Sequence, residues 1–122
     1  MKHREVTAKI IDCAYKVHRE LGFGFLEKVY QNALVIELTK ADVKVEQEKK
    51  VKVSYDGQVI GDFTADVVVE EKVILELKSV KQSHAAHEAQ LINYLKATGI
   101  EVGLLINFGE TVEIKRKVLD HS

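Results

Sequence analysis

The feature that most constrains the fold is a strand–turn–strand pattern in the middle of the chain. Residues 61–69 and 73–78 are rich in β-branched and aliphatic side chains, which favour strands, and a charged segment at 70–72 separates them. A connection this short joins antiparallel strands, because parallel strands need a crossover of about a dozen residues or more. The sequence therefore predicts an antiparallel hairpin here.

Three charged side chains, Asp66, Glu76 and Lys78, lie inside these otherwise apolar strands. Side chains alternate between the two faces of a strand, so Glu76 and Lys78 point the same way. A three-residue turn pairs Val69 with Val73 and places Asp66 opposite Glu76, with their Cβ atoms about 4.5–5.5 Å apart. Two carboxylates that close repel each other unless a proton or a cation lies between them, and a divalent metal is the natural occupant. The alternative is a cross-strand salt bridge on a solvated face, and the pattern alone does not decide between them.

The remaining periodicities predict a mixed α/β or α+β domain built around one sheet. Residues 44–55 alternate strictly, which predicts a half-buried strand whose apolar face carries Val45, Val51, Val53 and Tyr55. Ser83 is suited to cap the third helix and Gly99 to end it. Helices are expected over residues 5–20, 25–40 and 84–98, and strands over residues 44–55, 58–69, 73–80, 102–106 and 112–119.

Length and composition narrow the class of protein. A chain of 122 residues suggests one domain over 1–122, and 46% hydrophobic with 30% charged residues argues against disorder. No apolar run approaches the roughly 20 residues that span a bilayer. The lone Cys13 forms no internal disulfide, so a cytoplasmic location is expected. A net charge of −1 weakens the case for tight, non-specific nucleic-acid binding but leaves room for a local basic patch.

Two helices carry further polar residues at helical spacing. Glu27 near the start of the second helix is explained by its interaction with the helix N-terminus, and Tyr30 by burial in the core. His87, Gln90 and Tyr94 share one face of the third helix, which indicates either a satisfied polar network or a binding surface. His87 has no second histidine or cysteine placed to join it at a metal. Spacing alone favours a structural role for each of these residues.

Several separate stretches together resemble a known family. Residues 24–30 fit the signature Gly-x-x-Glu-x-x-Tyr of the GxxExxY family, which is similar to the PD-(D/E)XK nuclease superfamily. The resemblance covers about residues 5–118 and continues through segments 61–66, 76–78, 87–99 and 102–109. One departure is Phe23, which stands between the two glycines where family members often have proline. The resemblance implies a restriction-endonuclease-like core, in which helices flank a central mixed sheet.

The resemblance also implies a site that binds Mg²⁺ or Mn²⁺. Asp66 and Glu76 are then metal ligands, with the backbone carbonyl of Leu77 as a third. Lys78 would orient or activate the attacking water and stabilise developing charge. Glu27 matches an acidic residue on the first core helix of such nucleases.

On the following helix, the resemblance assigns Gln90 to the orientation of a phosphate or a water. Tyr30 and Tyr94 belong to the same motifs and count as accessory site residues. The function expected is a metal-dependent nuclease that acts on nucleic acid, with DNA preferred over RNA, and the resemblance allows a homodimer. The alternative is a non-catalytic, nuclease-like module that binds nucleic acid or protein.

Overall fold

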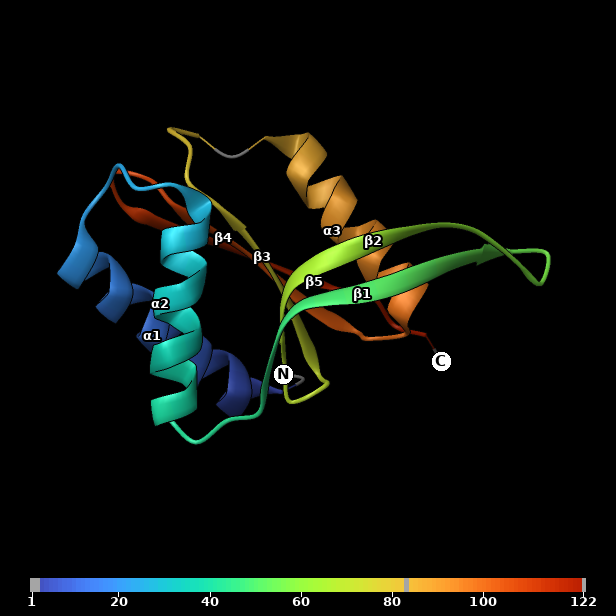
Figure 1. Ribbon diagram of the computed structural model, residues 1–122, viewed down its shortest axis with the longest axis horizontal. Helices are drawn as coiled ribbons and strands as arrows, with labels where there is room; N and C mark the ends of the chain where they lie inside the picture. The colour runs from blue at the N-terminus through green and yellow to red at the C-terminus, as the bar shows by residue number, and fades with distance from the viewer. Residues whose placement is uncertain (1–2, 83, 122) are drawn as a thin grey trace.

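The computed structural model describes residues 3–82 and 84–121. They form a five-stranded mixed sheet and three helices (Figure 1). Within the described residues, no helix combines the length and the apolar character that crossing a membrane requires. In chain order, the elements are α1 (Arg4–Leu21), α2 (Glu27–Lys40), β1 (Val45–Tyr55), β2 (Gln58–Val69), β3 (Val73–Lys78), α3 (Ala85–Thr98), β4 (Val102–Phe108) and β5 (Val112–Val118).

The sheet has the strand order β1-β2-β3-β4-β5. The first three strands form an antiparallel meander, β4 lies parallel to β3, and β5 is antiparallel to β4. Helix α3 makes the crossover that parallel strands require. This arrangement confirms the predicted α+β class and the order of its elements.

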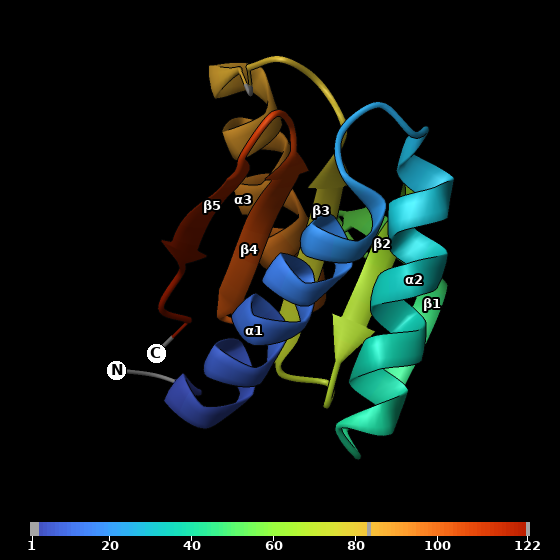
Figure 2. The ribbon, with the colours of Figure 1, turned by 90° about the vertical axis from the view of Figure 1, so that its left-hand side faces the viewer.

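Helices cover both faces of the sheet (Figure 2). Helices α1 and α2 bury one face over a core that includes Ile10, Leu34 and Tyr30. Helix α3 covers the other face through Leu91 and Leu95, which pack on Val68. All seven residues of β4 are buried, as expected for a strand covered on both faces.

Helix boundaries agree with the sequence expectation to within two residues. Gly99 adopts a φ of 77° after α3, and its N–H donates to Leu95 O, so it ends the helix as predicted. Helix α2 begins at Glu27 because Leu26 is still extended, with φ −68° and ψ 155°. The predicted cap Ser83 lies outside the described residues, and His84 occupies the N-cap position.

The β2–β3 hairpin has the predicted register. Val69 pairs with Val73, and the ladder continues to Val67 opposite Leu75. In this register Glu76 shares with Ile74 the face that α3 covers, and Asp66, just beyond the last ladder pair, is brought beside Glu76 by its contact with the Leu77 N–H. A register slip by one residue, which would have excluded a shared site, does not occur.

The expected single apolar face of the strand over 44–55 is wrong. Val45 packs against the core under α1 and α2, whereas Val51 pairs with Phe63, which packs on the α3 side. The change of face occurs at Glu48, which has a φ of +54° and, like Asp66 opposite it, is missing from the ladder. Beyond this kink the hairpin extends alongside α3, and Tyr55 near its tip is 73% exposed rather than buried (Figure 1).

Candidate active site

The site begins where β2 and β3 separate, at Asp66. In place of a backbone pair, the N–H of Leu77 donates to Asp66 Oδ2 at 2.8 Å. The carbonyl of Asp66 accepts a hydrogen bond from Gln31 Nε2 of α2, also at 2.8 Å. One contact fixes the side chain and the other the backbone, so Asp66 is held at the kink in a defined orientation.

Gln31 is a residue that the sequence reasoning missed. It is 5% exposed on α2 and lies directly after Tyr30 of the glycine–glutamate–tyrosine signature. A glutamine at an inward-facing helix position needs a hydrogen-bond partner, and this was the available signal. Its partner is a backbone carbonyl 35 residues away, which spacing cannot identify.

Glu76 is buried beside Asp66 without adequate compensation. Its side chain is 4% exposed, and Oε1 has no hydrogen-bond partner within the described part of the chain. Burial first, and then the charge of Asp66, raise the pKa of Glu76 to about 8. Burial also raises the pKa of Asp66, although the Leu77 N–H and then Lys78 oppose the shift. We call these two residues the carboxylate pair: it favours a shared proton or a bound cation.

Lys78 and Glu27 bring a positive and a negative charge to the same place. The charge of Lys78 favours the ionised forms of Asp66, Glu76 and Glu27. Partial burial raises the pKa of Glu27, with Lys78 lowering it and Asp66 raising it. Glu27, at the first position of α2, is therefore within electrostatic range of both strand residues, although it is exposed to solvent.

The polar face of α3 also turns toward the carboxylate pair. Burial and then the charges of Glu76 and Asp66 raise the pKa of Tyr94, and a hydrogen bond from Gln90 opposes this. The pKa of His87 is lowered by burial and then by Lys78. From the third helix, Tyr94 thus lies within electrostatic range of the carboxylate pair and His87 within range of Lys78, and Gln90 hydrogen-bonds to Tyr94, while Glu27 comes from the second helix.

Tyr30 lies in the core. It is fully buried, and its ring stacks on Phe108 with centroids 4.6 Å apart. Its hydroxyl donates to the carbonyl of Gly22 and accepts from the N–H of Phe25 at 3.3 Å. These contacts hold the loop that leads into α2 and thereby position Glu27. The structure thus gives Tyr30 a place in which it supports the site without facing the carboxylate pair.

The backbone conformation at position 24 explains why the signature begins with glycine. Gly24 has a φ of 117°, which a residue with a side chain rarely adopts. The carbonyl of the next residue, Phe25, accepts a hydrogen bond from Ser79 Oγ at 2.7 Å, so the loop is fastened to the chain just beyond β3. The signature therefore encodes a loop that brings the start of α2 to the end of the strand that carries Lys78.

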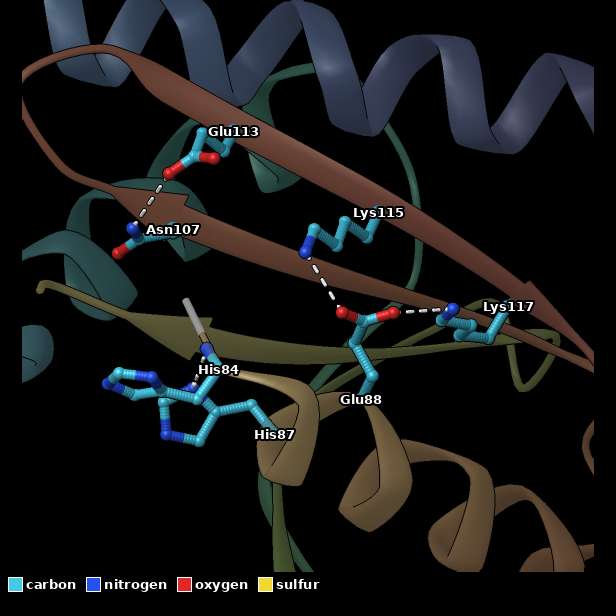
Figure 3. A network of polar contacts seen from close by, with 7 residues as sticks. All are labelled: His84, His87, Glu88, Asn107, Glu113, Lys115 and Lys117. Carbon is cyan, nitrogen blue, oxygen red and sulfur yellow. Dashed lines mark hydrogen bonds and ion pairs between the residues drawn. The ribbon is translucent and has the colours of Figure 1, made fainter. Parts of the chain in front are cut away.

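Asn107 is a second residue that the sequence reasoning missed (Figure 3). It is 1% exposed on β4 and pairs with Lys78 across the parallel ladder. Its side chain accepts from the N–H of Val80 at 3.0 Å and donates to the carbonyl of Val80 at 2.9 Å. Nδ2 also donates to Glu113 at 3.3 Å. Asn107 thus fixes the chain two residues beyond Lys78, and the signal was a lone amide in a buried apolar strand.

The donor set suits a hard divalent cation held partly by water. Among residues 3–82 and 84–121, no three His, Cys, Asp or Glu side chains come together as a metal-binding group. Two carboxylates and the carbonyl of Leu77 are nevertheless the oxygen ligands that Mg²⁺ accepts, because Mg²⁺ keeps several waters. The unpartnered Oε1 of Glu76 supplies the independent observation, since a bound cation would satisfy it.

Comparison with known proteins supports the fold and identifies the family. No curated protein compared with the chain matches it. The crystal structure of SSO0001 has a similar fold, with a TM-score of 0.60 and 19% sequence identity over 76% of this chain. The aligned part spans 50% of the length of SSO0001. A family model described as PD-(D/E)XK nuclease superfamily matches residues 4–117. With nearly its whole length matched, a restriction-endonuclease-like sheet and paired carboxylates on β2 and β3, the chain belongs to the PD-(D/E)XK nuclease superfamily.

Proposed function

We propose that this protein is a metal-dependent nuclease that hydrolyses phosphodiester bonds, with DNA as its substrate. Superfamily membership supports a nuclease-type function and interaction with nucleic acid. The observation that carries the metal-dependent mechanism is the unpartnered, buried oxygen of Glu76 beside Asp66. A structural salt bridge would not leave a buried oxygen of either carboxylate without a partner.

Asp66, Glu76 and the carbonyl of Leu77 would hold Mg²⁺ or Mn²⁺. When bound, such an ion neutralises the carboxylate pair and acts as a Lewis acid toward a phosphate. The Leu77 N–H contact fixes one oxygen of Asp66. The fit therefore rests on this oriented carboxylate and on the buried Glu76 oxygen that has no partner in the described residues.

The remaining residues act on the substrate and the attacking water. Lys78 carries the positive charge nearest the carboxylate pair on its own strand, so it would orient the water and stabilise charge that develops on the phosphate. Glu27 can accept a proton or a hydrogen bond from that water, because burial raises its pKa. Gln90, exposed on α3, would hold a phosphate oxygen, with Tyr94 beside it.

The test is a cleavage assay on single- and double-stranded DNA and RNA with Mg²⁺ and with Mn²⁺. Wild type should cut at least one substrate only when the metal is present, and Asp66→Ala should cut none. A thermal melt gives an independent readout, because a metal that binds only the folded state stabilises it by about 2.7 kcal/mol at a hundredfold excess over Kd. Asp66→Asn should lose this shift. A wild type that neither cuts nor shifts at roughly 10 mM metal would contradict the proposal.

A non-catalytic, nuclease-like module is the second candidate. Its support is the net charge of −1, which gives no overall attraction for phosphates. Metal-dependent stabilisation without cleavage of any substrate would favour this candidate. Cleavage that Lys78→Ala abolishes would reject it.

A further inference from the structure

A groove of about 880 Å³ runs between α3 and the outer half of the β1–β2 hairpin. We call residues 51–55 and 58–63 of that hairpin the arm, and the hollow the arm groove. Its α3 side is lined by small and amide side chains, including Ala86, Ala89 and Asn93. Its arm side includes Val53, Ile60 and Phe63. The strands of the arm pass beside α3, and β1 contacts this helix (Figure 1).

The arm groove shares two residues, Gln90 and Tyr94, with the candidate active site. Of these, Tyr94 is electrostatically coupled to both members of the carboxylate pair. Tyr94 stacks on Phe63 of the arm, with ring centroids 3.7 Å apart and planes at 3°. A strand whose phosphate lies at the carboxylate pair would therefore have its neighbouring nucleotides against these rings.

The chemistry of the groove walls distinguishes an unpaired strand from a duplex. A duplex presents its phosphates outward and is gripped by cations, whereas an unpaired strand offers base faces and base edges. Aliphatic and aromatic walls suit base faces, and the amides of Gln90 and Asn93 suit base edges. Among the lining residues, Lys96 and Asp62 carry charge, and a carboxylate can accept from the amino group of a base but repels phosphate.

Positively charged side chains lie at the end of the arm groove, where the sugar-phosphate backbone of a bound strand would leave the groove. A neighbouring hollow of about 330 Å³ shares Ala97 with the arm groove and is lined by Lys49, Lys50 and Lys52 of β1. Lys49 forms an ion pair with Glu46 at 3.1 Å, while Lys50 and Lys52 are exposed. The charge of these lysines complements phosphates of a strand whose bases lie in the groove.

We infer that the arm groove binds an unpaired strand of DNA, and that the enzyme prefers single-stranded DNA or single-stranded ends to a continuous duplex. This rests on the proposed nuclease function and adds the form of the substrate. The choice of DNA over RNA comes from the proposed function, and a single-stranded RNA of the same sequence tests it.

The test measures binding separately from cleavage. A labelled single-stranded oligodeoxynucleotide, the same sequence as a duplex, and the same sequence as RNA are titrated by fluorescence anisotropy into the full chain carrying Lys78→Ala with Mg²⁺. The single-stranded DNA should bind more tightly than either competitor. Equal or tighter binding of the duplex would overturn the inference, and equal binding of RNA would overturn the choice of DNA.

Two matched pairs of variants locate the binding. Ala89→Leu fills the groove, whereas Ala85→Leu adds the same atoms to α3 outside it. Ile60→Ser removes an apolar wall residue, whereas Val59→Ser changes its exposed neighbour outside the groove. All four sites are exposed, so each variant should fold. Ala89→Leu and Ile60→Ser should each weaken single-strand binding by about tenfold, the range of one lost base contact, and the controls by less than about twofold.

The outcomes separate this inference from the proposed function. Groove-dependent binding of single-stranded DNA without cleavage by the wild type would support the groove and reject the nuclease. Metal-dependent cleavage that Ala89→Leu and Ile60→Ser leave unchanged, with unchanged single-strand binding, would support the nuclease and reject the groove.

Discussion

Helix α3 borders two polar clusters, and comparison of the two shows which acid is available to a ligand. On one side it meets the carboxylate pair, where Glu76 is buried and one of its oxygens lacks a partner. On the other side Glu88 of α3 meets β5, where Lys115 contacts one of its oxygens at 2.9 Å and Lys117 the other at 2.6 Å (Figure 3). Glu76 and Glu88 are the same amino acid, and only their surroundings differ.

The two surroundings shift the acids in opposite directions. Burial and the charge of Asp66 raise the pKa of Glu76 to about 8. The hydrogen-bonded ammonium groups of Lys117 and Lys115 lower the pKa of Glu88 to about 2. The ion-paired carboxylate of Glu88 links α3 to the edge strand of the sheet, which is a structural role. The buried carboxylate of Glu76 has an oxygen that a cation would satisfy, and this marks a candidate functional site.

The largest expected effect comes from removing one cation from each cluster in turn. Lys78→Ala should lower the rate of metal-dependent DNA cleavage by about 10²–10⁴-fold, because it removes the group proposed to orient the water and stabilise charge. Lys115→Ala, its counterpart beside Glu88, should leave the rate within about twofold, because a partly exposed surface ion pair contributes little. The measurement is the cleavage rate of both variants in Mn²⁺. Equal losses in both variants would show that the two clusters do not differ in function.

The next effect is on stability against pH, measured without metal. Above pH 4.5 the unfolded chain releases the proton of Glu76 while the folded chain retains it up to about pH 8, so folding stability falls as pH rises through this window. Glu76→Gln stays neutral and avoids this loss, so it should be more stable than wild type at pH 9 by several kcal/mol and similar at pH 4. Urea unfolding at pH 4, 7 and 9 measures the difference. Parallel pH profiles for the two proteins would mean that Glu76 ionises freely in the fold.

For the carboxylate pair, the sequence predicts the feature that local geometry fixes, which is the register of the β2–β3 hairpin. Apolar strands with a three-residue turn allow one register that keeps both faces consistent, and the structure has it, with Val69 opposite Val73. The kink at Glu48 was not predictable in the same way. A glutamate with a φ of +54° carries no sequence signal, and the strict alternation of the strand indicated a regular element.

Contacts between side chains and distant backbone explain what sequence reasoning missed. Gln31 reaches the carbonyl of Asp66 across 35 residues, and Asn107 reaches Val80 across 27. Each contact depends on how a helix or strand docks, so spacing along the chain cannot reveal it. Tyr30 shows the converse: its place in the signature was recognised, but its position in the core, beneath the loop before Glu27, required the structure.

A third, smaller effect tests whether the hydrogen bonds of Asn107, which lie away from the carboxylate pair, stabilise the fold around the site. Asn107→Ala removes its side-chain hydrogen bonds to the backbone N–H and carbonyl of Val80, a partly buried residue, at a cost of about 1–3 kcal/mol. Asn32→Ala on α2, where the amide is exposed, is the control and should cost less than about 1 kcal/mol. Urea unfolding at pH 7 measures both. A loss for Asn107→Ala no greater than for the control would mean that Val80 finds other partners.

The smallest expected effect belongs to Glu88, and its sign is opposite to that of Glu76. Because the folded pKa of Glu88 is about 2 and its ordinary value is 4.5, the contribution of Glu88 is present above pH 4.5 and is lost as the pH falls toward 2. Glu88→Gln should therefore melt slightly below wild type at pH 7, and the gap should close at acid pH. The Glu88 side chain is 23% exposed, so about 1 M salt should also narrow the gap at pH 7. Thermal melts at pH 7 and pH 2.5, with and without salt, decide the matter. A gap that widened on acidification would show that Glu88, like Glu76, resists ionisation in the folded protein, and the contrast between the two clusters would then fail.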